Sequence, residues 1–208
     1  MSVSQVLNDI KTGKYSFQIN KLRELLSNNL FDNYVNEKKK LPAVTFCGTF
    51  NGIRKREFIK EYNQILVIDI DKLDEQEFER VKSIVKSEEF VFASWISPSQ
   101  NGIKGLISLS FKSDVNSTDI ELIDIRHKIA FKQIQEYYSE KYNINIDSSG
   151  SDTTRLCFFS LDPELKIKNE YKQFEIEEIE FQVPISIKTK ERTSPNISIG
   201  RKDLMFNL

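Results

Sequence analysis

A short apolar segment that ends in two carboxylates constrains this chain more than any other feature. Residues 65–71 read Ile-Leu-Val-Ile-Asp-Ile-Asp, and their β-branched content predicts a buried strand. Side chains two positions apart on a strand point to the same face, so Asp69 and Asp71 are expected to share one site. Two interpretations stay open: a magnesium or manganese site that relieves their mutual repulsion, or solvated aspartates with Lys72 as an ion-pair partner.

The segments that follow predict a sheet covered by helices. Residues 76–87 carry an apolar stripe with helical spacing, and residues 90–97 read as the next strand, which together give a β-α-β unit. Residues 97–102 form a polar loop before a strand over residues 103–111, so a hairpin is expected. Residues 118–142 predict the longest helix, lying across one face of the sheet.

The regions on either side of this core have weaker patterns. A leucine stripe predicts one amphipathic helix over residues 17–36, so residues 1–40 are expected to form a helical brace. Residues 38–40, Lys-Lys-Lys, are interpreted as a solvated linker in preference to a phosphate-binding patch. A strand over residues 43–50 leads to a turn at Asn51-Gly52 and a short helix that begins at residues 54–56.

Towards the C-terminus, shorter elements are expected. Residues 146–150 read as a polar turn, residues 155–160 as a strand and residues 174–183 as a closing strand. These boundaries predict a core over residues 41–183, followed by residues 184–208, which are expected to be a linker toward a further C-terminal module.

Composition limits the class of protein. The 30 Lys and Arg residues against 31 Asp and Glu residues give a net charge of -1, so binding to a polyanion requires a local basic face. No apolar run reaches the roughly 18 residues of a membrane-spanning helix, and no signal peptide is apparent, so a cytoplasmic location is expected. Cys47 and Cys157 are expected to be buried free thiols, too few for a zinc site.

Two further features carry chemistry. Asp147 considered alone is interpreted as an ordinary turn residue. It becomes a candidate metal ligand only in combination with Asp69 and Asp71. The segment from Ser97 to Lys104 offers hydroxyl groups, backbone N–H groups and one cation, which suits a phosphate cradle without the Walker pattern. Three carboxylates beside a phosphate cradle are what two-metal phosphoryl transfer requires. His127 and Trp95 are interpreted as structural residues.

The order of these features resembles the archaeo-eukaryotic primase superfamily, in particular the primase-polymerase-like domain of Bacteroides-type mobile-element proteins, the virulence-associated E N-terminal domain. The resemblance covers about residues 15 to 170, most of the chain. The matching segments are residues 41–50 (LPAVTFCGTF) with Arg54, residues 67–73 (VIDIDKL), residues 97–104 (SPSQNGIK), Ile146-Asp147, and residues 152–163.

The resemblance implies a fold and a set of site residues. The fold would be α+β, a primase-like core whose RRM-like mixed or antiparallel sheet is flanked by helices, with the N-terminal helical portion packed against it. The catalytic and metal-binding residues would be Asp69, Asp71 and Asp147; the nucleotide-binding residues Ser97, Ser99, Gly102, Lys104 and Arg155; and the contacts to template or phosphate Arg54 and Arg56. Lys104 stands where the superfamily has a histidine, and Ser99-Gln100 stands where it has Ser-Gly.

The expected activity is template-directed synthesis of nucleic acid from NTPs or dNTPs, with Mg²⁺ or Mn²⁺ as the cofactor and no zinc. Single-stranded DNA would be the template and a fused or separate helicase a partner, with no role for a membrane. Two alternatives are a non-catalytic DNA-binding or scaffold domain that serves a replication helicase, and a metal-dependent nuclease that uses the same carboxylates.

Overall fold

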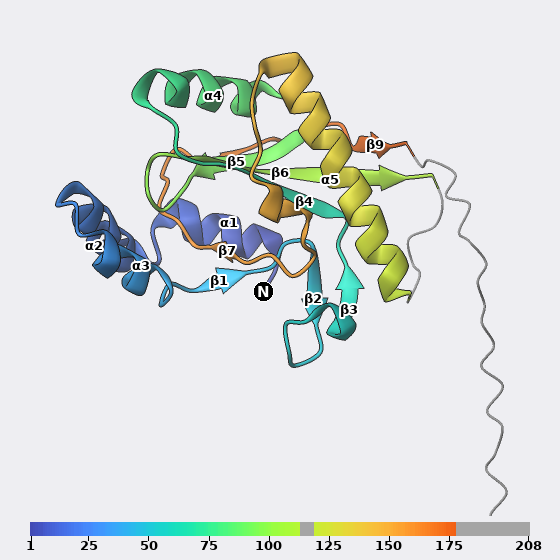
Figure 1. The fold of residues 1–208 in the computed structure, drawn as a ribbon, viewed down its shortest axis with the longest axis horizontal. Coiled ribbons are helices and arrows are strands. Elements are labelled where there is room, and N and C mark those ends of the chain that lie inside the picture. The colour runs from blue at the N-terminus through green and yellow to red at the C-terminus, as the bar shows by residue number, and fades with distance from the viewer. Residues whose placement is uncertain (113–118, 178–208) are drawn as a thin grey trace, which may run out of the picture. The chain divides into compact units, whose positions relative to one another are not determined.

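The central element is a sheet in which the strand that carries Asp69 lies at one edge. In a computed structural model, which describes residues 1–112 and 119–177, the strand order is β4 (Ile65–Ile70), β6 (Ile103–Phe111), β5 (Val91–Ile96) and β8 (Lys166–Ile167), and β9 (Phe174–Ile176) also pairs with β6 (Figure 1). β6 runs antiparallel to β4 and β5 and parallel to β9. The prediction of a mixed α+β fold is confirmed.

The predicted β-α-β unit is present, but its two strands are not neighbours. α4 (Glu75–Ser87) connects β4 to β5, and β6 lies between these strands, paired antiparallel with both. The predicted hairpin is confirmed, since β5 and β6 pair on either side of the loop at residues 97–102. The β4–β6 register places Asp69 directly opposite Lys104, so a carboxylate and an amine face each other across the ladder.

Side-chain alternation along β4 divides the protein into layers. Leu66, Ile68 and Ile70 are buried in a cluster with residues of α4 and α5 (Ile120–Tyr142) on one face of the sheet. Each such aliphatic side chain contributes about 1.5–3 kcal/mol when fully buried. The alternate residue Val67 packs on the opposite face, in a second cluster that includes α1 (Val3–Thr12) and Trp95. Asp69 follows the phase of Val67 and therefore lies on the face away from α4 and α5.

The N-terminal region is helical, but its boundaries differ from the prediction. The single helix expected over residues 17–36 is wrong: the structure has α2 (Ser16–Ser27) and α3 (Phe31–Lys38), and α1 precedes them. Asn29 has a φ of 58°, a left-handed conformation that a continuing α-helix cannot contain. The leucine spacing continues across this break only in the sequence, since Leu22 is buried whereas Leu30 is 48% exposed.

The strand expected over residues 43–50 is also divided. β1 (Ala43–Val44) pairs with β7 (Cys157–Phe158), whereas β2 (Gly48–Phe50) pairs with β3 (Ile59–Tyr62). Gly48 lies against the partner strand, where a Cβ atom would come within 2.6 Å of the carbonyl oxygen of Glu61. The short helix expected at residues 54–56 is the 3₁₀ turn η1 (Arg56–Phe58), and a second such turn, η2 (Ser148–Ser151), follows Asp147.

Other expectations have mixed outcomes. The long helix is confirmed as α5, whose first turn is capped by Asp119, and β9 occupies the start of the expected closing strand. The strand expected at residues 155–160 is reduced to the two residues of β7. Residues 178–183 and the linker over residues 184–208 lie outside the described residues. Both cysteines are buried free thiols, and Trp95 is 1% exposed, as expected.

Candidate metal and nucleotide site

Three aspartates meet at the end of β4. One carboxylate oxygen from each of Asp69, Asp71 and Asp147 can be chosen so that all three lie within 4.8 Å of one another. Asp69 is buried, Asp147 is half-buried and Asp71 is exposed. We call this group the acidic triad. The two strand residues were expected to share a face, and the structure adds the third, which lies 76 positions further along the chain.

Backbone and side-chain hydrogen bonds hold Asp147 in place. Its backbone N–H donates to the carbonyl of Asp69 over 2.8 Å, so the loop is attached directly to the strand. Its carboxylate accepts from the N–H of Ser149 at 3.0 Å and from the Ser149 hydroxyl at 2.8 Å. Partial burial alone would raise the pKa of Asp147, but these hydrogen bonds and the charge of Arg155 outweigh it and lower the pKa.

His127 supports the same loop from the helix behind it. Its Nε2 lies 3.1 Å from the carbonyl oxygen of Gly150, and its Nδ1 lies 3.0 Å from the hydroxyl of Tyr62. A carbonyl only accepts, so Nε2 carries the proton and the Tyr62 hydroxyl donates to Nδ1. Burial lowers the pKa of His127, which favours this neutral form. The structural interpretation of His127 is confirmed, although the residue is buried and not on the helix surface.

Asp69 has one strong partner and one unsatisfied oxygen. Lys104, also buried, donates from Nζ to Oδ2 of Asp69 in an ion pair across the β4–β6 ladder. The other oxygen, Oδ1 of Asp69, is buried and has no hydrogen-bond partner in the described part of the protein. An unpaired buried carboxylate oxygen is costly unless a ligand satisfies it, and a divalent cation is the ligand that this donor set fits.

Gly102 has no side chain, and the carboxylate of Asp71 occupies the space where one would lie. A Cβ atom on Gly102 would come within 2.3 Å of Oδ1 of Asp71 and within 2.7 Å of the carbonyl oxygen of Ile70. Asp71 is exposed as a residue, but its carboxylate lies against Gly102; partial loss of solvent there, and then the negative charge of Asp69, raise its pKa above the usual value. Asp71 is therefore held where its charge is unfavourable, which is the electrostatic condition that a bound cation relieves.

The loop at residues 97–102 forms one wall of the site. The N–H of Ser97 donates to the carbonyl of Gly102 over 2.8 Å, and the hydroxyls of Ser97 and Ser99 are 2.9 Å apart. Gln100 makes the tight turn with a φ of 66°, a conformation that glycine usually supplies. Arg23 on α2 supports this loop, because its Nε donates to the carbonyl oxygen of Pro98 at 3.3 Å. Its Nη2 donates to the carbonyl oxygen of Leu161 at 2.8 Å, so the guanidinium also connects the loop to that segment.

Two further cations border the triad. Nη2 of Arg155 lies 3.4 Å from Oδ2 of Asp147 and 3.9 Å from Oδ2 of Asp69. Lys38, at the end of α3, lines the same cavity, so the interpretation of residues 38–40 as a solvated linker is wrong for this lysine. In the sequence, Lys38 lies four residues after Tyr34, a spacing that places two side chains side by side on a helix. We call this cavity of about 80 Å³ the acidic pocket; it is lined by Lys38, Asp69, Asp71, Ser97, Pro98, Ser99, Lys104, Arg155 and Phe158.

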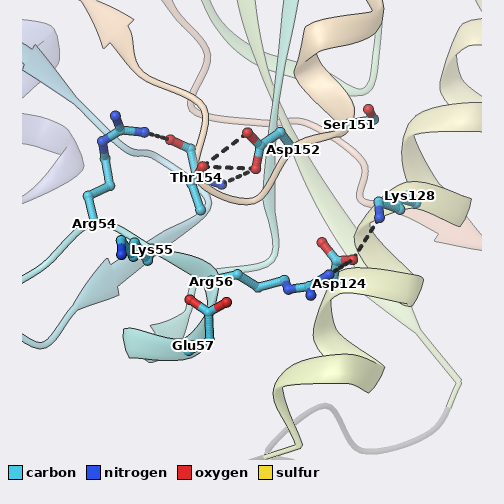
Figure 2. Close-up of a pocket in the computed structure, with 9 residues that line it drawn as sticks. All are labelled: Arg54, Lys55, Arg56, Glu57, Asp124, Lys128, Ser151, Asp152 and Thr154. Carbon is cyan, nitrogen blue, oxygen red and sulfur yellow. Dashed lines mark hydrogen bonds and ion pairs between the residues drawn. The ribbon is translucent and has the colours of Figure 1, made fainter.

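Arg54 and Arg56 do not line the acidic pocket. They border a second, more open cavity of about 490 Å³, which we call the basic pocket; its lining is Arg54, Lys55, Arg56, Glu57, Asp124, Lys128, Ser151, Asp152 and Thr154 (Figure 2). Arg56 and Lys128 both bind Oδ2 of Asp124, at 2.9 Å and 2.8 Å, and Arg54 donates to the carbonyl of Thr154. The chain from residue 147 to residue 155 connects the two pockets, because its ends border the triad and its middle lines the basic pocket.

Comparisons with known proteins assign the chain to a family. None of the helices in the described residues has the length and apolar character needed to cross a membrane. No curated protein and no solved structure matches the chain. One family model matches over residues 36–166, the BT4734-like N-terminal domain, and this range contains the triad, the loop at residues 97–102 and the basic pocket. Because the match extends over more than half of its residues, the chain belongs to the BT4734-like N-terminal domain family.

Proposed function

We propose that this protein is a metal-dependent nucleotidyltransferase of the DNA primase/polymerase type, which extends nucleic acid on a single-stranded DNA template. The observation that carries the proposal is the acidic triad, whose ligand oxygens lie within 4.8 Å of one another beside a loop of hydroxyl groups and cations. Carboxylates so arranged would suit two divalent ions, which would supply Lewis-acid chemistry at a reacting phosphate group.

Asp69, Asp71 and Asp147 would hold Mg²⁺ or Mn²⁺. The unsatisfied Oδ1 of Asp69 and the raised pKa of Asp71 support this fit. When bound, the ions supply Lewis-acid activation of a 3′-hydroxyl and charge neutralisation of the leaving group. In the reaction, the 3′-oxygen loses its proton and forms a bond to the α-phosphorus, while the bond from that phosphorus to pyrophosphate breaks.

The cations of the acidic pocket suit the triphosphate of the incoming nucleotide. Arg155 lies within 4 Å of two triad carboxylates without being buried, so it is free to turn toward a phosphate once metal ions neutralise those carboxylates. Lys104 is held by its ion pair with Asp69 and supplies a fixed positive charge at the buried side of the acidic pocket. Ser97, Ser99 and the N–H groups of their loop supply neutral donors.

The basic pocket suits the backbone of the template. Its four cations outnumber its three carboxylates, and Asp124 is already shared by Arg56 and Lys128. Lys55 has no ion-pair partner among the described residues. Such a surface provides contacts to phosphate that are independent of sequence, and the local excess of positive charge explains how a chain of net charge -1 can bind DNA.

Membership of the archaeo-eukaryotic primase superfamily is part of this proposal. It is supported by the α+β fold, by the position of Asp69 and Asp71 at the C-terminal end of β4, and by the return of Asp147 to that strand. The finer features stay proposals as well: an RRM-like sheet, service in a mobile genetic element, and a fused or separate helicase as partner.

The test is a primer-extension assay with single-stranded DNA, labelled nucleotides, and Mg²⁺ or Mn²⁺, with and without primer. An Asp71→Asn/Asp147→Asn variant removes two triad charges and leaves the buried pair of Asp69 with Lys104 intact. A Glu140→Gln/Glu170→Gln variant removes the same charge at exposed positions and serves as the matched control.

The products separate the candidate functions. Lengthened products in the wild type and the control, but not in the triad variant, would establish the polymerase activity, and products without primer would establish the primase activity. Shortened DNA would indicate a nuclease. If the wild type neither extends nor shortens DNA while it still binds DNA, the nucleotidyltransferase proposal fails and a scaffold domain is the better account.

A further inference from the structure

Three consecutive lysines end the N-terminal helices, and only the first has a defined place beside the site. Lys38 is half-buried and lines the acidic pocket, whereas Lys39 and Lys40 are exposed. Lys40, just beyond the end of α3, pairs with Glu37 over 2.6 Å. The run therefore contains one lysine that faces the site and two that face solvent.

The ammonium group of Lys38 is held by aromatic rings and not by a carboxylate. Its Nζ lies 5.6 Å from the ring centre of Tyr34 and 5.9 Å from that of Phe158, which also lines the acidic pocket. No carboxylate among the described residues lies within ion-pair distance of it. Exposed cation–π contacts are weak compared with a charge-assisted hydrogen bond to phosphate, so the rings position the lysine without neutralising it.

The charge balance of the pocket indicates what this cation binds. The three triad carboxylates are matched by the three cations Lys38, Lys104 and Arg155. Two divalent ions would add four positive charges, and a nucleoside triphosphate carries about four negative charges at neutral pH. With Lys38 included, the site loaded with metal ions and nucleotide is close to neutral, whereas a monophosphate would leave it strongly positive.

We infer that Lys38 binds the triphosphate of the incoming nucleotide, at a phosphate other than the one that reacts. This inference rests on the proposed function. Lys38 lines the cavity without contacting a triad carboxylate, so the reacting phosphorus, held at the metal ions, is bound by other groups. α3 thus contributes a substrate-binding residue from the N-terminal region, which the sequence presents only as a brace.

The test is calorimetric titration with a non-hydrolysable nucleoside triphosphate in the presence of Mn²⁺. Lys38→Ala is compared with the matched variant Lys39→Ala and with the conservative variant Lys38→Arg. We expect Lys38→Ala to weaken binding of the triphosphate about tenfold and binding of the corresponding monophosphate less than twofold. Lys39→Ala should bind like the wild type, and Lys38→Arg should retain most of the affinity because it keeps the charge.

Titration with Mn²⁺ alone should show a change in affinity of the opposite sign. Lys38→Ala removes a positive charge beside the triad, so Mn²⁺ alone should bind more tightly to this variant than to the wild type. An unfolded variant would bind both the triphosphate and Mn²⁺ more weakly. A melting temperature close to that of the wild type shows that each variant is folded. Equal triphosphate affinity in Lys38→Ala and Lys39→Ala would overturn the inference, as would an equal loss for triphosphate and monophosphate. If the wild type itself binds no nucleotide, the proposed function fails and this inference with it.

Discussion

The acidic pocket and the basic pocket are built from charged residues in opposite ways. In the acidic pocket, the carboxylates lie at the end of a buried strand, and one oxygen of Asp69 has no partner among the described residues. In the basic pocket, Asp124 accepts from two cations, and Asp152 accepts from the N–H and hydroxyl of Thr154. The first pocket therefore keeps a buried carboxylate oxygen without a hydrogen-bond partner, whereas in the second pocket Asp124 and Asp152 are hydrogen-bonded and the excess charge is positive and exposed.

This difference shows how burial separates a site for chemistry from a surface for binding. The β4–β6 ladder fixes Asp69, and hydrogen bonds to Asp69 and Ser149 fix Asp147, so their charges have little freedom to move apart. The basic pocket is carried by long side chains on η1 and α5, which remain solvated and adapt to a strand of any sequence (Figure 2). The comparison therefore supports the proposal that metal ions bind in the first pocket and template phosphates in the second.

The largest effect is expected from Asp69→Ala. It leaves the buried ammonium of Lys104 without its partner, so the free energy of unfolding should fall by about 3–5 kcal/mol. Urea denaturation of the metal-free protein measures the change. Asp124→Ala in the basic pocket should cost less, because Arg56 and Lys128 stay hydrated. Equal losses of unfolding free energy in Asp69→Ala and Asp124→Ala would contradict the difference in burial between the two pockets.

A smaller effect is expected from Gly102→Ala. The added methyl group would collide with Asp71 and with the backbone of Ile70, so the carboxylate must move and the affinity for Mn²⁺ should fall about 10- to 100-fold. Titration with Mn²⁺ measures this loss. Gly52→Ala is the control: its φ of 73° makes alanine unfavourable there as well, but no atom lies within 4 Å of the added group, so stability should fall without a loss of metal affinity.

The pH dependence of stability provides a third test. The raised pKa of Asp71 means that the folded protein holds its proton more tightly than the unfolded chain does. The resulting stabilisation is present at acidic pH and is lost as the pH rises through the raised pKa. In EDTA, Asp71→Asn should therefore match the wild type near pH 4 and have the higher melting temperature at pH 7. Identical profiles for the two proteins would show that Asp71 is not under electrostatic strain.

The smallest effect is expected in the basic pocket. Lys55→Ala should weaken binding of single-stranded DNA a few-fold at low salt, and the slope of log K against log salt should fall by about 0.7. Fluorescence anisotropy at several salt concentrations measures both, with Lys11→Ala as the control at an exposed position on α1. Affinity for nucleoside triphosphate should not change in Lys55→Ala, and such a change would remove the distinction between the pockets.

The sequence predicts the parts of this fold that depend on local periodicity. The strand β4, the helices α4 and α5, and the hairpin of β5 and β6 follow from apolar patterns and turn residues. The break at Asn29 was not predicted, because the spacing of the leucines gives no indication of the left-handed backbone at Asn29. The placement of β6 between β4 and β5 was not predicted either, since pairing partners are set by tertiary packing.

The site was predictable to a similar extent. The pairing of Asp69 with Asp71 follows from strand geometry, but the position of Asp147 depends on a hydrogen bond to the Asp69 carbonyl that no local pattern specifies. The four-residue spacing from Tyr34 to Lys38 is visible in the sequence, but the contact of Lys38 with Phe158, which places it at the acidic pocket, depends on how α3 packs. The separation of Arg54 and Arg56 from the acidic pocket likewise needed the structure.

The central claim is that the acidic triad holds the divalent ions of a nucleotidyltransferase. Anomalous diffraction from crystals grown with Mn²⁺ and a non-hydrolysable nucleoside triphosphate tests it most directly, because the ions and their ligands are located without reference to activity. The account predicts manganese peaks coordinated by Asp69, Asp71 and Asp147, with the side chain of Arg155 moved off these carboxylates. Nucleotide bound elsewhere, with no manganese at the triad and Arg155 still paired with Asp147, would contradict it.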